Sequence, residues 1–238
     1  MITLVVGLAA AGGTFESGNA ALATGDLAGA EAGYRGALAA GYTGGSVWYN
    51  LGNVLYREQK TGGAILAWRI AATRLPRDPD IEANLEFARR STRDKLDVPS
   101  PHPTLAPWQV ALTPDEGMWL GGACAGAGLG LLAARRRHPH LPLVGSGISL
   151  VVLGVVAGVG GVADANLPPV AVVLVSEVTA TSDLGGGVDL FTLHAGAEVL
   201  TVEEEAGKVQ ILLPDGRRGW IPVGQVGFVD ADRPFPVL

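Results

Sequence analysis

The dipeptide Gly18-Asn19 recurs 34 residues later as Gly52-Asn53, and other positions repeat in the same register. The matching pairs are Ala30 with Ala64, Tyr34 with Trp68, and Ala37 with Ala71. A repeat of this length is one supersecondary unit, which cannot bury its apolar face alone and must stack on a neighbour. The period therefore constrains this part of the chain to a stack of repeated helical units.

A 34-residue period is that of the tetratricopeptide (TPR) repeat, a pair of helices. The second unit carries most of the consensus, at Trp48, Leu51, Gly52, Leu55, Ala64, Trp68, Ala71 and Pro76. A third helix is expected over residues 80–96, where Ile81, Leu85 and Ala88 share one face and would cap the array. We predict a TPR domain over residues 12–97, with two repeats and a capping helix. The alternative is an alanine-rich helical bundle.

The 238-residue chain is too apolar for an ordinary soluble protein, with 48% hydrophobic and 17% charged residues. Its net charge of −6 is concentrated late, since eleven acidic and four basic residues follow position 163. The earlier part is balanced, so neither part has the basic surface of a nucleic-acid-binding protein.

Two uncharged stretches suit a bilayer core, which needs about 20 helical residues. They cover residues 118–134 and 143–163, and a basic loop over residues 135–142 joins them. A linker over residues 98–117, Pro-rich at its start, precedes them. Because basic loops stay in the cytoplasm, we predict a two-pass transmembrane hairpin with both large domains on the outer, periplasmic side. Apolar residues 1–11 end in Ala9-Ala10-Ala11 and resemble a signal peptide, truncated at its start.

Small residues recur at four-residue intervals in both apolar stretches and predict helix packing in the membrane. They are Gly122, Gly126 and Gly130 in the first stretch and Gly154 and Gly158 in the second. Two interpretations remain open: the two helices pack on each other, or one face joins a helix of a partner. The single cysteine, Cys124, is interpreted as a packing residue.

Residues 170–230 change to short strands separated by turn residues, and a tail of residues 231–238 follows. The expected strands are Ala171–Val175, Glu177–Thr181, Glu198–Glu204, Val209–Leu213 and Arg218–Pro222. Five short strands in this length favour a small barrel. The closing Gly219-Trp220-Ile221-Pro222 resembles a bacterial SH3-type domain. We therefore predict a multi-domain fold, an α-solenoid and a membrane hairpin followed by an all-β SH3-type barrel.

Residue types typical of catalysis do not assemble into a pattern. The histidines at 102, 138, 140 and 194 form no metal-ligand spacing with carboxylates, and no phosphate-binding glycine loop occurs. A single cysteine excludes an internal disulfide and a cysteine-based zinc site. We predict no enzyme activity, no metal and no cofactor.

The TPR register instead predicts a peptide-binding groove on the first helix of each pair. Its residues are Phe15, Asn19, Tyr49, Asn50, Asn53, Arg57, Asn84 and Arg90. An Asn side chain both donates and accepts, so it can bind the backbone of an extended peptide, and the arginines can bind a carboxylate. The alternative for Asn50 and Asn84 is that they tie neighbouring repeats together, and it is left open for Asn50, whereas ligand contact is favoured for Asn53.

The order of the predicted domains resembles that of the BatE proteins, which are encoded in bacterial aerotolerance operons. Three stretches of the sequence also resemble theirs. They are residues 15–19, residues 48–53 and residues 79–88. The resemblance implies a cell-envelope protein of the bacterial inner membrane. It also implies partners, namely von Willebrand A-type membrane proteins and a MoxR-like ATPase.

Two classes of function remain. The first is a membrane-anchored scaffold that binds protein partners through the groove and assembles an envelope complex. The second is an envelope stress or cell-wall sensor whose SH3-type domain binds peptidoglycan peptide or activates a wall hydrolase, since an acidic domain suits a partner with amines.

Overall fold

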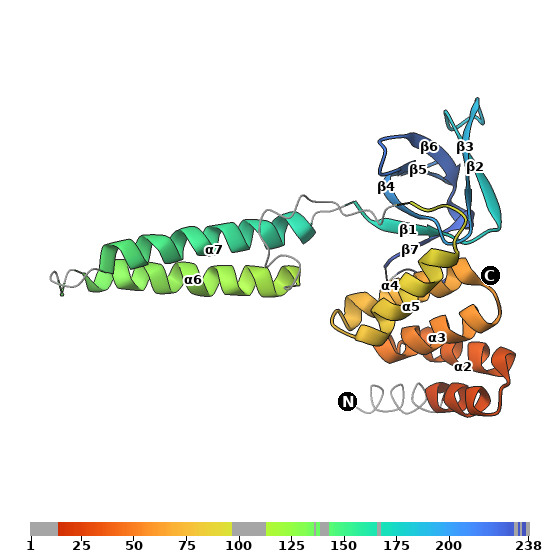
Figure 1. The fold of residues 1–238 in the computed structure, drawn as a ribbon, viewed down its shortest axis with the longest axis horizontal. Coiled ribbons are helices and arrows are strands. Elements are labelled where there is room, and N and C mark those ends of the chain that lie inside the picture. Colours follow the sequence, from red (N-terminus) through yellow and green to blue (C-terminus); the bar gives the residue numbers. More distant parts are fainter. Residues whose placement is uncertain are drawn as a thin grey trace. The chain divides into compact units, whose positions relative to one another are not determined.

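The computed structural model describes residues 14–96, 113–135, 137–138, 143–165, 168–230, 233 and 235–236. These residues form a mixed helix and sheet protein (Figure 1). The chain divides into two compact units. Unit 1 combines Met1–Pro99 with Pro169–Leu238, and unit 2 is Ser100–Pro168. The predicted signal peptide and most of the predicted linker lie outside the described residues.

Unit 1 begins with consecutive antiparallel helices. A helix over residues 14–23 precedes α2 (Leu27–Ala39), α3 (Gly45–Arg57), α4 (Thr61–Arg74) and α5 (Pro79–Ser91). Each of α3, α4 and α5 packs on the helix before it. Asp26 and Asp78 cap α2 and α5 by accepting hydrogen bonds from free backbone amides. The core holds the aromatic residues of the repeat register, with Tyr34, Trp48 and Trp68 all buried. We call these helices the helical array.

The last helix of the array is shorter than the sequence predicts, because α5 ends at Ser91 and not near residue 96. The Thr92 hydroxyl donates to the carbonyl oxygen of Arg89 at 2.7 Å and closes the final turn. Two residues later, the Asp94 carboxylate accepts from the backbone amide of His194. The chain thus leaves the helical path just before it contacts a distant strand.

The rest of unit 1 is one antiparallel sheet of seven strands. They are β1 (Val170–Val173), β2 (Glu177–Thr181), β3 (Asp189–His194), β4 (Glu198–Glu205), β5 (Lys208–Leu212), β6 (Arg218–Pro222) and β7 (Val226–Phe228). A short 3-10 turn, η2 (Val223–Gln225), separates the last two. The order across the sheet is β3-β2-β6-β5-β4-β1-β7. The sheet is open, since β3 and β7 are its edges, and the closed barrel expected from the sequence is not formed by these pairings.

Two strands were absent from the sequence prediction. β3 directly follows the glycine loop and is largely exposed, so it lacks the alternating apolar pattern that marks a half-buried strand. β7 has only three residues and exists through its pairing with β1. Both are edge strands, whose local sequence is the least constrained by burial.

Unit 2 contains two apolar helices, α6 (Pro114–Ala134) and α7 (Leu143–Ala165), which pack on each other. Thr113 and Glu116 form a capping box at the start of α6, so that helix begins four residues before the expected apolar stretch. By length and composition, Asp115–Ala134 can cross a membrane. The apolar stretch Val144–Gly158 of α7 falls short of that length. One possible span is therefore found among the described residues, and the two-pass topology stays a prediction.

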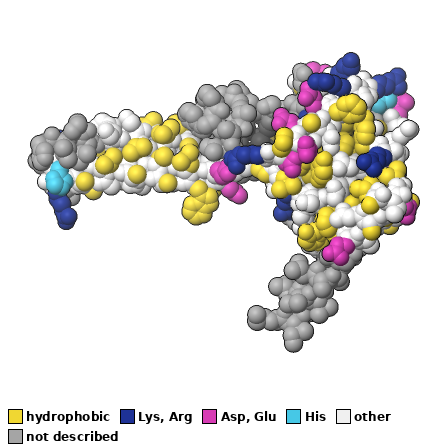
Figure 2. Space-filling view, turned by 60° about the horizontal axis from the view of Figure 1, so that its bottom comes forward, with side chains coloured by type: hydrophobic (Ala, Val, Ile, Leu, Met, Phe, Trp, Pro, Cys, Tyr) yellow, Lys and Arg dark blue, Asp and Glu magenta, His cyan; other side chains and the backbone are white. Residues whose placement is uncertain are grey.

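Large apolar side chains of unit 2 point outward. Figure 2 shows hydrophobic side chains along the surface of this helix pair. Trp119 is 81% exposed, and Leu129 and Val152 are also exposed. A surface of this kind is unusual in water and is expected where the surroundings are themselves apolar.

The glycines that bring α6 and α7 together include the two predicted in α7 but not the three predicted in α6. A methyl group added at Gly121 would lie 2.7 Å from the carbonyl oxygen of Gly154, and one at Gly128 would lie 2.6 Å from that of Gly147. A methyl group on Gly122, Gly126 or Gly130 would meet nothing within 4 Å. The interpretation that these last three pack the pair on itself is therefore wrong, because they lie on an open side of α6. Gly154, by contrast, lies in the contact, and the backbone of Gly158 approaches Gly121.

Candidate binding site

The repeated Gly-Asn dipeptide has a structural role in the helical array. The Asn19 Oδ1 accepts from the Tyr34 hydroxyl at 2.8 Å and from the Nδ2 of Asn50 at 3.2 Å. Burial raises the pKa of Tyr34, so its hydroxyl keeps its proton and remains a donor. One oxygen thus joins the second helix of its own repeat to the first helix of the next.

The same arrangement recurs one period later. The Asn53 Oδ1 accepts from Trp68 Nε1 at 3.2 Å and from the Nδ2 of Asn84 at 3.0 Å. We call Asn19, Asn50, Asn53 and Asn84 the asparagine ladder. Because an indole replaces a phenol at the same place, the repeat conserves a donor and not a residue type.

The glycine of each dipeptide admits the aromatic ring that donates to the neighbouring asparagine. A methyl group on Gly18 would lie 2.8 Å from the Tyr34 ring, and one on Gly52 would lie 2.5 Å from the indole of Trp68. The two residues of each Gly-Asn pair therefore act together: the glycine makes room for an aromatic ring, and the asparagine accepts the hydrogen bond that this side chain donates.

The asparagines have a structural role, and their predicted role in a groove stays a prediction. The tie between neighbouring repeats, left open for Asn50, is present at both Asn50 and Asn84. The Asn19 and Asn53 side chains are partly exposed, and their Nδ2 groups have no acceptor among the described residues. Those two donors remain free for a ligand, and ligand contact at them stays a prediction.

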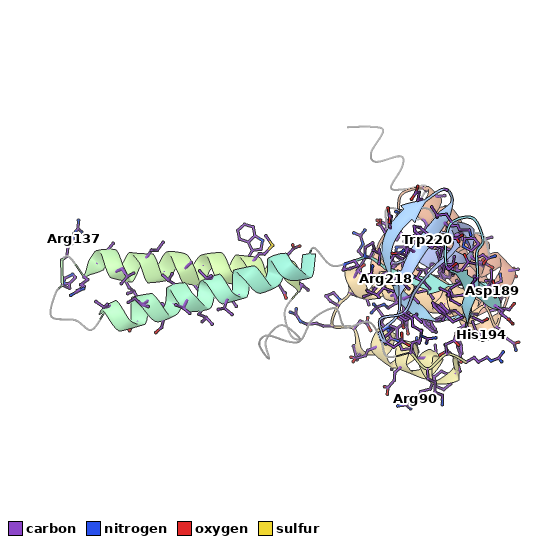
Figure 3. All side chains as sticks on the ribbon, turned by 90° about the horizontal axis from the view of Figure 1, so that it is seen from above. Arg90, Arg137, Asp189, His194, Arg218 and Trp220 are labelled. Atoms are coloured by element: carbon purple, nitrogen blue, oxygen red, sulfur yellow. The ribbon has the colours of Figure 1, made fainter. Side chains whose placement is uncertain are left out.

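The other predicted groove residues separate into two groups. Phe15 belongs to an aromatic cluster, with its ring 5.8 Å from that of Tyr34 and 5.6 Å from that of Tyr42. Tyr49 is half-buried, and Arg57 is exposed. Arg90, labelled in Figure 3, pairs with Glu86 on the exposed side of α5. Phe15 therefore packs the array, whereas the arginines remain available to solvent.

Two aromatic residues beside the asparagine ladder were missed by sequence reasoning. Phe87 of α5 is 62% exposed, and its ring lies 5.9 Å from that of Tyr56 in α3. Phe87 stands 34 residues after Asn53, so the repeat register could have identified it. We call Tyr49, Asn53, Tyr56, Arg57, Phe87 and Arg90 the aromatic face. It combines an exposed ring, a free amide donor and two cations, which are groups that bind peptide segments.

The sheet packs on the helical array through a buried cluster of charges. Glu198 at the start of β4 is only 4% exposed. Arg89 of α5 donates to both of its carboxylate oxygens, and the Nε of Arg69 in α4 lies 3.0 Å away without the alignment of a hydrogen bond. Burial lowers the pKa of Arg69 and the nearby Arg89 lowers it further, against the attraction of Glu198. A guanidinium stays charged in proteins even so.

Close backbone approach completes this junction, in which β1 and β7 lie against α4 (Figure 1). A methyl group on Gly62 of α4 would lie 2.4 Å from the carbonyl oxygen of Val173, and one on Gly227 would lie 2.1 Å from Leu66. The Asp94 carboxylate also lies 3.0 Å from the Nδ1 of His194. The helical array and the sheet are therefore one packed body within unit 1, which the sequence did not predict.

No protein-family model, curated protein or solved structure matches this chain.

Proposed function

We propose that this chain is a membrane-anchored, non-catalytic scaffold that binds protein partners through the aromatic face and assembles a cell-envelope complex. In this proposal the helical array is a TPR domain, the sheet is an SH3-type domain, and the protein is of the BatE kind. Its partners are von Willebrand A-type membrane proteins linked to a MoxR-like ATPase.

The observation that carries the proposal is the aromatic face itself. Phe87 and Tyr56 present apolar surface to solvent on adjacent helices, and the repeated hydrogen bonds of the asparagine ladder hold those helices in register. An exposed aromatic flanked by arginines is typical of a protein interface. A rigid stack of helices that exposes such residues is suited to binding and needs no catalytic group.

The outward apolar side chains of α6 and α7 support the membrane anchor. We propose that both helices cross the inner membrane, with the loop that holds Arg135 and Arg137 in the cytoplasm and unit 1 in the periplasm. The apolar residues 1–11 would then direct the N-terminal part of unit 1 to that side.

The test is a pull-down of full-length protein from native membranes in mild detergent, with bound proteins identified by mass spectrometry. The informative variant is Phe87→Ser combined with Arg57→Glu, because both side chains are exposed and neither holds the array together. The wild type is expected to retain a von Willebrand A-type membrane protein that the variant loses. Val188→Ser, at an exposed position beside β3, is the control and is expected to retain it. If the variant and the wild type retain the same membrane proteins, the aromatic face is not the binding site.

A second candidate function is a cell-wall sensor, and the exposed acidic side chains at the end of β4 favour it. Glu203, Glu204 and Glu205 are all exposed, and they suit a ligand with free amines, such as a peptidoglycan stem peptide. Calorimetric titration with stem peptide should use the whole chain, because removing the helical array would leave Glu198 without its arginines. Absence of heat at millimolar peptide would exclude this function.

A further inference from the structure

Residues near the C-terminus occupy a site on the helical array. The Phe235 ring packs on the indole of Trp48 in α3, with centroids 5.4 Å apart. The guanidinium of Arg35 in α2 lies 4.9 Å from the centre of the same ring, and its Nη1 donates to the carbonyl oxygen of Pro236 at 2.9 Å. An aromatic–proline pair is thus held by an indole and a cation, which is how many proteins bind short peptide segments.

Phe235 and Pro236 leave two buried hydrogen-bond donors of this site without acceptors. Trp48 is 1% exposed, and its Nε1 has no hydrogen-bond partner among the described residues. The Nη2 of Arg35 is also buried and unpartnered there, although Nε of the same side chain donates to Glu31. Buried donors are nearly always satisfied in proteins, so the site is built to hold more acceptors than Phe235 and Pro236 supply.

The same residues also leave space unfilled. A cavity of about 250 Å³ adjoins them, and its walls include Leu66, Ile70, Val226, Phe228, Phe235 and Pro236. Its walls are largely apolar, so a larger apolar ligand could extend into it. Among the described residues, the two unpartnered donors and the adjoining cavity indicate that Phe235 and Pro236 do not satisfy the whole site.

We propose that the Arg35–Trp48 site binds an aromatic–proline segment of a partner protein, and that Phe235-Pro236 occupies it as a competing internal ligand in the free protein. A tethered segment competes at a high effective concentration, so the site is closed to weak ligands. A partner displaces it by supplying acceptors to Trp48 Nε1 and Arg35 Nη2 and by filling the cavity.

This site is distinct from the aromatic face. Trp48 and Tyr49 are successive residues of α3, so their side chains point about 100° apart around the helix. Trp48 is buried and its ring packs on Phe235, whereas Tyr49 belongs to the aromatic face. The two sites can therefore be tested separately, and failure of one proposal leaves the other standing.

The experiment measures binding of a fluorescein-labelled hexapeptide, Arg-Pro-Phe-Pro-Val-Leu, to the full-length protein in detergent micelles by fluorescence anisotropy. This is the sequence of residues 233–238. Phe235→Ala is expected to bind the peptide at least about tenfold more tightly than the wild type, because the internal competitor is weakened. Adding Arg35→Ala to that variant is expected to reverse the gain. Equal affinity of Phe235→Ala and the wild type would overturn the proposal.

Two further variants keep the test decisive. Phe87→Ala removes an exposed ring from the aromatic face and is expected to leave peptide affinity unchanged; a loss there would mean that the peptide binds the aromatic face. If Phe235→Ala does not fold, Phe235→Leu keeps the apolar bulk and removes the ring contacts. A gain of at least about threefold is then expected, and no gain contradicts the proposal.

Discussion

The glycines of the Gly-Asn repeats in unit 1 and the contact glycines of unit 2 serve different purposes. In unit 1, Gly18 and Gly52 make room for large aromatic side chains, which then donate hydrogen bonds to the asparagine ladder. In unit 2, Gly121 and Gly154 bring the backbones of α6 and α7 directly together, with no large side chain between them. Glycine therefore makes room for side chains in the Gly-Asn repeats of unit 1 and for backbone in the α6–α7 contact of unit 2.

The difference follows from where each unit places its large apolar side chains. Unit 1 buries Tyr34, Trp48 and Trp68, and their removal from water stabilises the array. Unit 2 leaves Trp119, Leu129 and Val152 exposed, so its largest apolar side chains do not lie in the contact between its helices. Close backbone approach between small residues is the packing mode that works when the surroundings are apolar. The contrast is that unit 1 buries its large apolar side chains, whereas unit 2 exposes them, as the proposed membrane anchor requires.

Among the variants considered, we expect the largest loss of stability when Glu198, at the junction of the sheet and the helical array, is replaced. Glu198→Ala would leave Arg69 and Arg89 partly buried without their carboxylate. Removing one partner of a buried ion pair costs about 3–5 kcal/mol of unfolding free energy. Urea denaturation of the full-length protein, followed by tryptophan fluorescence, measures the loss. Glu204→Ala, at an exposed carboxylate paired with Arg233, is the control and is expected to cost less than about 1 kcal/mol. Similar losses for the two variants would contradict the buried role of Glu198.

The close backbone contact between α6 and α7 can be tested by substituting two neighbouring glycines of α6. Gly121→Ala places a methyl group 2.7 Å from the carbonyl oxygen of Gly154, and backbone atoms cannot easily move. We expect a loss of about 1–3 kcal/mol, typical of overpacking. Gly122→Ala is the matched control, since that position is open. Unfolding of the protein in mixed detergent micelles, followed by circular dichroism, compares the two. An equal loss in both would show that the α6–α7 contact is not made by Gly121.

We expect a smaller loss of stability when the asparagine ladder is disrupted, and a neighbouring exposed residue provides the control. Asn53→Ala leaves Trp68 Nε1 and Asn84 Nδ2 without their acceptor, which should cost about 1–2 kcal/mol of stability. Phe87→Ala, on the exposed ring beside it, should change stability by less than about 0.5 kcal/mol. Thermal denaturation of both variants measures the difference. If Asn53→Ala is as stable as the wild type, the ladder does not hold the repeats together.

The smallest expected effect is a dependence of stability on pH. Burial alone would raise the pKa of Glu31, but hydrogen bonds from Lys60 and Arg35 outweigh it and lower that pKa. The hydrogen bond to Glu31 raises the pKa of Lys60, which also lies 2.9 Å from Glu58. A lowered carboxyl pKa stabilises the fold above about pH 4.3, and that contribution is lost as the pH falls further. A raised amine pKa stabilises the fold below about pH 10.4, and that contribution is lost as the pH rises.

The two contributions together predict a flat region between these pH values and declines of a few tenths of a kcal/mol at each end, since the side chains are partly exposed. Lys60→Met should flatten the decline at high pH. The measurement is the urea midpoint of the wild type and Lys60→Met across the pH range. A decline at high pH that is unchanged in the variant would assign it to other groups.

Much of the candidate site follows from the repeat register, but the role of its residues does not. Spacing alone places Asn19 and Asn53 at equivalent positions, and Phe87 shares that register. The partner of each asparagine oxygen, a phenol in one repeat and an indole in the next, depends on how the helices pack. Local spacing specifies which residues are equivalent, and only packing specifies which atoms meet.

The sequence by itself determined the elements with strong local signals: the helices of the 34-residue repeat, two apolar helices, and five of the seven strands. These depend on periodicity and turn residues within a few positions of one another. The tertiary structure alone decided that the sheet packs on α4, that Phe235 lies on Trp48, and that Gly122 lies on an open face of α6. Arg89 and Glu198 are 109 residues apart, and no local pattern encodes their contact. Long-range contacts form where complementary surfaces meet, and surface complementarity does not exist until the elements have folded.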